Sequence, residues 1–313
     1  FGKSFRTHTQ RSLIRNGDSS FVVKGMFSLQ GSRDEIAAQV NKHSGQQLKL
    51  NGKSLSGRTE IIGRNNVVVL SPEEQPITKG PPVKRRQFFD KMFSVSNRDY
   101  VKTLKKYSRV LKQRNAALLL VKENKSTVTV LKHWDEQLVY AGAKLWLMRV
   151  DLITQFKNNV ASMIQRYDSS IRFEMVYFDE APREEIYRKQ VRDALNTDLA
   201  LGRTTVGPHR DEILFIWDKR DLRNFGSQGE HKLALVLLKL AEMCFIRDNT
   251  GSYPILLLDD LFSKLDFERS QKIVSLLQSL ENKSSNKSIG CEPVLSRIKH
   301  ISANFNNTRA SLC

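Results

Sequence analysis

The strongest signal of the fold is the stretch Tyr253-Pro-Ile-Leu-Leu-Leu-Asp-Asp-Leu-Phe-Ser-Lys-Leu-Asp266, an apolar run that ends in two adjacent carboxylates. The run Ile255–Leu258 is too short for a helix and is bounded by Pro254 and Asp259, which predicts a strand buried on both faces of a parallel sheet. Such a strand delivers the next residues to the carboxyl edge of the sheet, where open α/β sheets hold ligands. Two carboxylates there favour a hard cation such as Mg²⁺ with phosphate, although a strand followed by a polar turn explains the same residues.

Composition narrows the class of protein. The 313 residues are 40% hydrophobic, and no apolar run approaches the roughly 18 residues that a membrane span requires. We therefore expect a cytoplasmic protein with no membrane partner. The net charge of +18, from 51 Lys and Arg against 33 Asp and Glu, favours a polyanionic partner, with nucleic acid as the leading candidate.

The N-terminal region is predicted to be rich in strands, at residues 21–27, 47–50 and 67–70. Four prolines within residues 71–90 end this layer and indicate a boundary near Pro82. Further along the chain, residues 171–178 and 213–217 are predicted as strands. His209 lies in a polar turn between them and is interpreted as an ordinary surface histidine.

Two amphipathic helices are predicted in the middle of the chain. Their buried faces repeat every three to four residues, first at Tyr100, Leu104, Tyr107, Leu111, Asn115 and Leu118, then at Trp134, Leu138, Leu145, Met148, Leu152 and Phe156. The aromatic members are expected in the core rather than on a base-stacking surface. The opposite face of the first helix carries the DNA-binding candidates Lys102, Lys105, Lys106, Arg109 and Lys112. Residues 79–149 hold 17 Lys and Arg against 5 Asp and Glu, which indicates a localised basic surface, although a solvated basic face has the same composition.

The turn Phe225-Gly-Ser-Gln-Gly-Glu-His-Lys232 precedes a helix that is apolar on nearly all sides and is therefore predicted to be buried. Ser227 and Glu230 form a predicted capping box, which explains both residues structurally. Gly229 costs about 1 kcal/mol relative to alanine in a helix, so we interpret it as a place where a ligand approaches the backbone. The free N–H groups and partial positive charge of a helix N-terminus suit a phosphate.

These two motifs, in this order and spacing, resemble the signature motif, Walker B strand and D-loop of ABC-type ATPase heads. Three further stretches narrow the resemblance to the RecF family of bacterial recombinational repair proteins: Lys3-Ser-Phe-Arg-Thr7, Ser71-Pro-Glu-Glu74 with Lys84-Arg-Arg-Gln-Phe-Phe-Asp90, and Thr205-Val-Gly-Pro-His-Arg-Asp211. The similarity covers most of residues 1 to about 280. It implies an α/β fold with an ABC-ATPase-like head, in which lobe I is a mixed β-sheet with helices and an inserted lobe II is mainly helical, without a long coiled coil.

The resemblance also implies a division of the chain. The β-rich part of lobe I would occupy residues 1–83, and the basic lobe II with the signature motif residues 84–245. Residues 246–281 would return to lobe I with the Walker B strand and D-loop. We expect the polar tail at 282–313 either to be disordered or to depart from the family.

The family resemblance implies an ATP-dependent homodimer that binds single-stranded and gapped DNA and assists RecA loading with RecO and RecR. Asp259 would hold Mg²⁺ through water, and Asp260 would polarise the attacking water of a weak ATPase. Ser263 and Asp266 of the D-loop would lie at the dimer seam.

The signature motif would serve the opposite subunit of this dimer. Ser227 and Gly229 would contact the γ-phosphate of the ATP bound there, and Gln228 and Glu230 would position the turn.

Departures from the family pattern limit these expectations. Family members carry a Walker A phosphate loop upstream of the segment matched by Lys3-Ser-Phe-Arg-Thr7, and Gly2-Lys3-Ser4 does not replace it. We therefore expect an N-terminal piece to be missing and nucleotide binding by this chain to be weak or absent. Glu74-Gln75-Pro76 differs from the usual acidic-leucine continuation, which puts a nucleotide-sensing role for Gln75 in doubt. No switch residue is found after the D-loop, and His300 is a poor candidate.

Two other functions are compatible with the sequence. A vestigial ATPase head would leave a DNA-binding module that works independently of nucleotide. A metal-dependent nuclease would use Asp259 and Asp260, but it leaves Gly229 and the spacing of the two motifs unexplained, so it ranks last.

Overall fold

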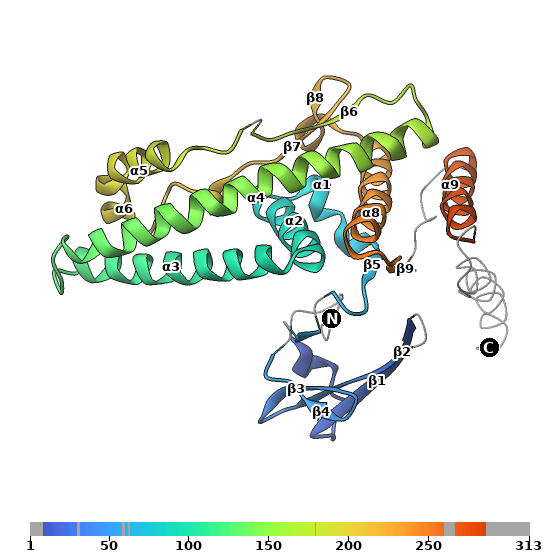
Figure 1. The fold of residues 1–313 in the computed structure, drawn as a ribbon, viewed down its shortest axis with the longest axis horizontal. Helices are drawn as coiled ribbons and strands as arrows, with labels where there is room; N and C mark the ends of the chain where they lie inside the picture. The colour runs from blue at the N-terminus through green and yellow to red at the C-terminus, as the bar shows by residue number, and fades with distance from the viewer. Residues whose placement is uncertain are drawn as a thin grey trace.

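The computed structural model describes residues 9–29, 32–57, 60–61, 63–178, 180–259 and 267–285. Within these ranges the chain forms three small sheets and a set of packed helices, two of which are long and lie side by side (Figure 1). None of the helices in these ranges combines the length and the apolar character needed to cross a membrane.

The N-terminal layer is an antiparallel sheet in the order β1-β2-β3-β4, drawn in blue in Figure 1. Its strands are β1 (Ser20–Leu29), β2 (Ser32–Asn41), β3 (Gly45–Leu50) and β4 (Lys53–Ser54), preceded by the short helix η1 (Gln10–Leu13). Asn51 and Gly52 join β3 to β4 with φ values of 50° and 80°, as a tight Asn-Gly hairpin requires. The sequence predicted β1 and β3 but missed β2, whose charged and small residues give little strand signal.

A second, parallel sheet joins distant parts of the chain. In it, β5 (Val67–Leu70) pairs with β9 (Ile255–Leu258), and Leu70 lies opposite Leu258. The predicted strand is therefore confirmed, but its burial on both faces is wrong, because Ile255 and Leu257 are 41% and 45% exposed. The face with Leu256 is buried, and the helix α8 (Gln228–Thr250) packs against β5.

The two long helices are α3 (Arg98–Lys122) and α4 (Val130–Tyr167), which form an antiparallel hairpin and contain both predicted amphipathic stretches. The Asn97 side chain caps α3 by accepting the N–H groups of Asp99 and Tyr100 at 2.9 and 3.0 Å. At 1.5 Å per residue, the 38 residues of α4 span about 57 Å. The turn and helices that lead from β5 into this hairpin are η3 (Pro72–Glu74), α1 (Pro76–Lys79) and α2 (Pro82–Ser96).

The rest of the helical region covers the hairpin. The helices α5 (Glu184–Asp193) and α6 (Leu195–Leu201) pack on α4 and α3, respectively. The strands β6 (Phe173–Val176), β7 (Leu214–Trp217) and β8 (Arg220–Asp221) form a third sheet, which confirms the strands predicted at 171–178 and 213–217, and β6 alternates buried and exposed residues. The remaining elements are η4 (Pro208–Arg210), α7 (Leu222–Phe225) and α9 (Phe267–Ser285), and α9 extends past the boundary expected at residue 281.

The core centres on α8, which is buried along residues 233–246 and packs against α4, α2 and β5. The predicted buried helix is thus confirmed. It also buries a charge, since Lys239 Nζ lies 3.2 Å from Glu74 and 2.5 Å from Glu242. A buried ammonium needs such partners to offset its desolvation, so this ion pair fixes η3 against α8.

Candidate nucleotide and DNA interfaces

The carboxyl edge of the parallel sheet carries Asp259 directly after β9. The backbone N–H of Asp259 donates to the carbonyl oxygen of Leu70 at 2.9 Å, which extends the strand pairing and places Asp259 beside Ser71. Ser71 is only 3% exposed, and its Oγ has no hydrogen-bond partner among the described residues. A carboxylate next to a buried, unsatisfied hydroxyl fits a hydrated Mg²⁺ ion with phosphate, because both groups are hard oxygen ligands.

The other residues predicted at this edge lie outside the part of the chain that the structure describes. Asp260, Ser263 and Asp266 fall within residues 260–266 and so lie outside the described residues. Among the described ranges, no group of three or more His, Cys, Asp or Glu side chains is arranged to hold a metal ion. Asp259 and Ser71 are therefore the observed part of this edge.

The turn at residues 225–232, which we call the signature turn, leads into α8 and lies at the surface. Ser227 Oγ accepts the N–H of Glu230 at 3.2 Å, and Glu230 Oε2 accepts the N–H of Ser227 at 2.7 Å, which confirms the capping box. Ser227 and Gln228 are exposed. The capping box uses the N–H groups of Ser227 and Glu230, so those of Gln228 and Gly229 remain outside it, at the positive end of the helix dipole.

The structure shows a close approach at Gly229, and the approaching group is a side chain. A Cβ atom on Gly229 would lie 2.6 Å from Nη1 of Arg269 in the first turn of α9. No feature of the sequence indicated that Arg269 would reach this turn. Together, the helix N-terminus and the guanidinium give this surface a positive potential that suits an anion.

His231 packs against the signature turn at Gly226. It is buried, its Nδ1 has no hydrogen-bond partner in the described part of the chain, and a Cβ on Gly226 would lie 3.1 Å from its Nε2. Burial, followed by the positive charge of Lys79, lowers the pKa of His231. A neutral, packed imidazole therefore holds the backbone just before Ser227.

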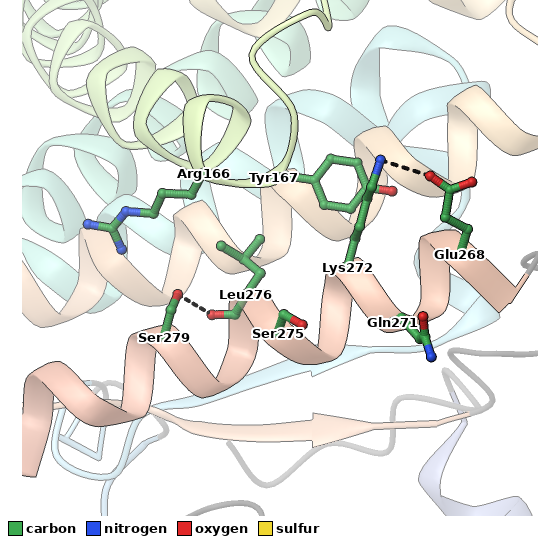
Figure 2. A pocket seen from close by; sticks show the side chains of 8 residues that line it. All are labelled: Arg166, Tyr167, Glu268, Gln271, Lys272, Ser275, Leu276 and Ser279. Carbon is green, nitrogen blue, oxygen red and sulfur yellow. Dashed lines mark hydrogen bonds and ion pairs between the residues drawn. The ribbon is translucent and has the colours of Figure 1, made fainter.

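A shallow pocket lies between the end of α4 and α9 (Figure 2). Its lining residues are Arg166, Tyr167, Glu268, Gln271, Lys272, Ser275, Leu276 and Ser279. Lys272 Nζ lies 3.1 Å from Glu268 and 3.7 Å from Asp168, and the Ser279 hydroxyl donates to the Leu276 carbonyl at 2.7 Å. These contacts do not point to a particular ligand, so we assign none to this pocket.

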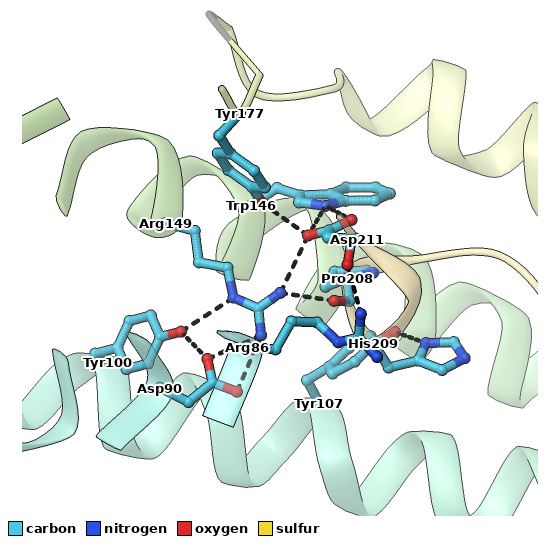
Figure 3. A network of polar contacts seen from close by, with 10 residues as sticks. All are labelled: Arg86, Asp90, Tyr100, Tyr107, Trp146, Arg149, Tyr177, Pro208, His209 and Asp211. Carbon is cyan, nitrogen blue, oxygen red and sulfur yellow. Dashed lines mark hydrogen bonds and ion pairs between the residues drawn. The ribbon is translucent and has the colours of Figure 1, made fainter. Parts of the chain in front are cut away.

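A buried polar network surrounds Asp211 (Figure 3). Its carboxylate accepts hydrogen bonds from Trp146 Nε1 at 2.8 and 2.9 Å, from the Tyr177 hydroxyl at 2.7 Å and from Arg149 Nη1 at 3.1 Å. Arg149 also donates to Asp90 at 2.9 and 3.2 Å. The network ties the turn that contains Asp211 to α4 and α2, which gives the family-like stretch 205–211 a structural role.

His209 belongs to the same turn, and its prediction as a surface histidine is wrong. Its Nδ1 lies 2.7 Å from the Tyr107 hydroxyl, and its Nε2 lies 3.1 Å from the carbonyl oxygen of Thr204. Nε2 must donate to that carbonyl, so the neutral tautomer with Nδ1 as acceptor fits both contacts. Burial lowers the pKa of His209 to about 4.

Several of the basic residues that contribute to the net charge are buried inside the fold and do not lie at the surface. Arg85, Arg114, Arg149 and Lys239 are buried and paired with carboxylates. For example, Arg114 donates to Asp135 and Asp198, each at 2.6 Å. These cations cannot contact DNA, so the basic surface is smaller than the composition suggests.

The five DNA-binding candidates, Lys102, Lys105, Lys106, Arg109 and Lys112, are all exposed on α3. Lys102 Nζ pairs with Asp99 at 3.0 Å, and Lys106 Nζ lies 4.8 Å from the centre of the Tyr140 ring. Arg109 and Lys112 make no hydrogen bond or ion pair with any described residue. Their charge is therefore uncompensated locally, as expected of a surface that meets an anion.

Comparisons with known proteins agree with this architecture. The DNA replication and repair protein RecF of Halothermothrix orenii is 34% identical over 289 residues, covering 88% of this chain and 76% of that protein. RecF of a Thermoanaerobacter species is 32% identical, covering 90% and 79%. No protein-family model matches the chain.

Solved structures give the same result. The recombination mediator protein RecF, solved with ATP and described as part of the RecFOR pathway, superposes with a TM-score of 0.80 at 30% identity, covering 88% of this chain and 76% of that one. A second RecF structure gives a TM-score of 0.79. The fold is therefore the predicted α/β type with an ABC-ATPase-like head.

Proposed function

The chain belongs to the RecF family of DNA replication and repair proteins, and we propose that it binds DNA through the exposed basic face of α3. The observation that carries this proposal is the row of exposed cations from Lys102 to Lys112, of which Arg109 and Lys112 have no partner in the described part of the chain. Over these positions the helix rises about 15 Å, which is enough to contact several consecutive phosphates.

Family membership extends this proposal to a role in recombinational repair. The protein would act on single-stranded and gapped DNA, and it would work with RecO and RecR to help RecA assemble. The RecFOR pathway named for the solved relative supports this role.

The nucleotide part of the proposal rests on two surfaces. Asp259 and Ser71 at the sheet edge would receive Mg²⁺ and the phosphates of ATP, and bound Mg²⁺ would neutralise phosphate charge. The N–H groups of Gln228 and Gly229 would bind the γ-phosphate held by a second copy of the protein, since they lie at an exposed helix N-terminus. The relative solved with ATP supports this assignment.

DNA binding is tested with a triple variant that removes three of these positive charges: Lys105→Gln, Arg109→Gln and Lys112→Gln. We expect its affinity for gapped DNA at about 0.1 M salt to fall about 10- to 100-fold, because each lost phosphate contact also loses counterion release. Fluorescence anisotropy with a labelled oligonucleotide measures this change.

The matched control makes the same charge change on the N-terminal sheet, at the exposed residues Lys42, Lys49 and Lys53. It should retain wild-type affinity within about twofold, because those residues lie outside the proposed surface. Equal losses in both variants would mean that only net charge matters and would refute the assignment to α3.

A further inference from the structure

Tyr140 is an aromatic residue that the core does not explain. It lies on α4 and is 54% exposed, whereas the other aromatic residues of that helix, Trp134, Trp146, Phe156 and Tyr167, pack in or against the two hydrophobic clusters. Tyrosine has an apolar ring that water solvates poorly, so such exposure on a rigid helix is a feature of binding surfaces. The sequence periodicity did not single out this residue.

The ring of Tyr140 meets the basic face of α3. Lys106 Nζ lies 4.8 Å from the ring centre, a cation–π distance that holds the ring beside the row of cations. Only one face of an aromatic ring can be covered by this ammonium, and more than half of the residue is accessible. One turn and two turns further along the same side of α4 lie Lys144 and Leu147, both exposed.

Acidic residues limit the length of this strip. Glu136 lies one turn before Tyr140, and Asp151 lies one turn after Leu147, and both are exposed. Their repulsion would keep a DNA backbone away from either end of the strip. The space between them suits a short contact of one to a few nucleotides rather than a long track along α4.

We propose that Tyr140, backed by Lys106, is a stacking site for an unpaired base of single-stranded DNA whose phosphates lie on the basic face of α3. An aromatic ring beside cations is the general arrangement by which proteins bind single strands, since every base has a face that can stack. The bases of a duplex are already stacked on one another, so the same ring gains nothing from paired DNA. This inference rests on the proposed DNA-binding role of α3 and adds the distinction between single-stranded and duplex DNA.

The test compares two variants. Tyr140→Phe keeps the aromatic ring, whereas Tyr140→Leu replaces the ring with an aliphatic side chain that is still apolar. Affinity is measured for an oligothymidylate and for a duplex of the same length. We expect Tyr140→Leu to weaken oligothymidylate binding about 5- to 100-fold, the fold-change that corresponds to the loss of one stacked base. Tyr140→Phe should bind as the wild type does, and duplex affinity should stay within about twofold in both variants.

A cross-linking readout separates contact from indirect effects. Oligothymidylate substituted with 5-iodouracil and irradiated on the wild-type protein should cross-link to the peptide that contains Tyr140. Equal binding of oligothymidylate by Tyr140→Leu and wild type, or equal losses for both DNAs, would overturn the stacking site while leaving DNA binding by α3 in place. Failure of the wild type to bind either DNA would instead refute the proposed function.

Discussion

His209 shows how strongly the chemistry of a residue depends on its surroundings. In the sequence it stands in a polar turn, and nothing local distinguishes it from a solvated histidine. In the fold, Tyr107 from α3 and the Thr204 carbonyl satisfy both ring nitrogens, and burial makes the charged form unfavourable. The contact with Tyr107 joins residues 102 positions apart, so no local pattern could have predicted it.

The pKa of His209 predicts a pH dependence of stability. The unfolded imidazole binds a proton below a pH of about 6.5, whereas the folded one does so only below about 4. Protons therefore favour the unfolded state in this window, and the free energy of unfolding should fall as the pH decreases from about 6.5 to about 4. His209→Gln, which can make both hydrogen bonds without titrating, should flatten this decline in urea denaturation series.

The control for this prediction is His43→Gln, an exposed histidine of the N-terminal sheet. It should leave the pH dependence of unfolding as in the wild type. An undiminished decline in His209→Gln would contradict the assignment of a neutral, hydrogen-bonded histidine at this position. Because burial also lowers the pKa of His231, the decline should become smaller in His209→Gln without disappearing.

At the scale of elements, α8 was the best-predicted helix and β9 the most instructive strand. The continuous apolar pattern and the capping box gave the start and the burial of α8 correctly, because both signals are local. The position of β9 also followed from its apolar run. Its burial did not, since the number of faces that a strand buries depends on which elements pack on the sheet.

At the start of α8, the substitution Gly229→Ala distinguishes a structural role of Gly229 from a functional one. In Gly229→Ala the new Cβ meets only the end of the flexible Arg269 side chain, which can move. The free energy of unfolding should therefore stay the same or rise by up to about 1 kcal/mol, the helix-propensity gain of alanine. If the Gly229 backbone binds phosphate in a second subunit, Gly229→Ala should nevertheless abolish ATP-dependent self-association of the protein in analytical ultracentrifugation.

Gly251→Ala at the other end of α8 is the matched control. Gly251 has a φ of 73°, so alanine there should cost about 1 kcal/mol in denaturant unfolding. It should leave self-association with ATP unchanged. Normal ATP-dependent association of Gly229→Ala would contradict the role proposed for the signature turn.

At the scale of the whole molecule, the net charge and the family were predictable from the sequence, whereas the extent of the exposed basic surface was not. The excess of 51 Lys and Arg over 33 Asp and Glu indicated a polyanionic partner. The sequence placed the exposed row on α3 correctly by helical periodicity. The sequence could not show that Arg114 and Arg149 form buried ion pairs and so do not belong to the surface. Nor could it show that Tyr140 lies beside Lys106, because both facts depend on how α3 and α4 pack.

The most direct test of DNA binding by α3 is the salt dependence of the affinity for duplex DNA. The logarithm of the association constant, plotted against the logarithm of salt concentration, has a slope of about −0.9 for each phosphate neutralised. We predict that the triple variant at Lys105, Arg109 and Lys112 reduces the magnitude of this slope by about 2 or more, because three phosphate contacts are lost. A slope equal to that of the wild type would contradict the assignment of the DNA surface to α3.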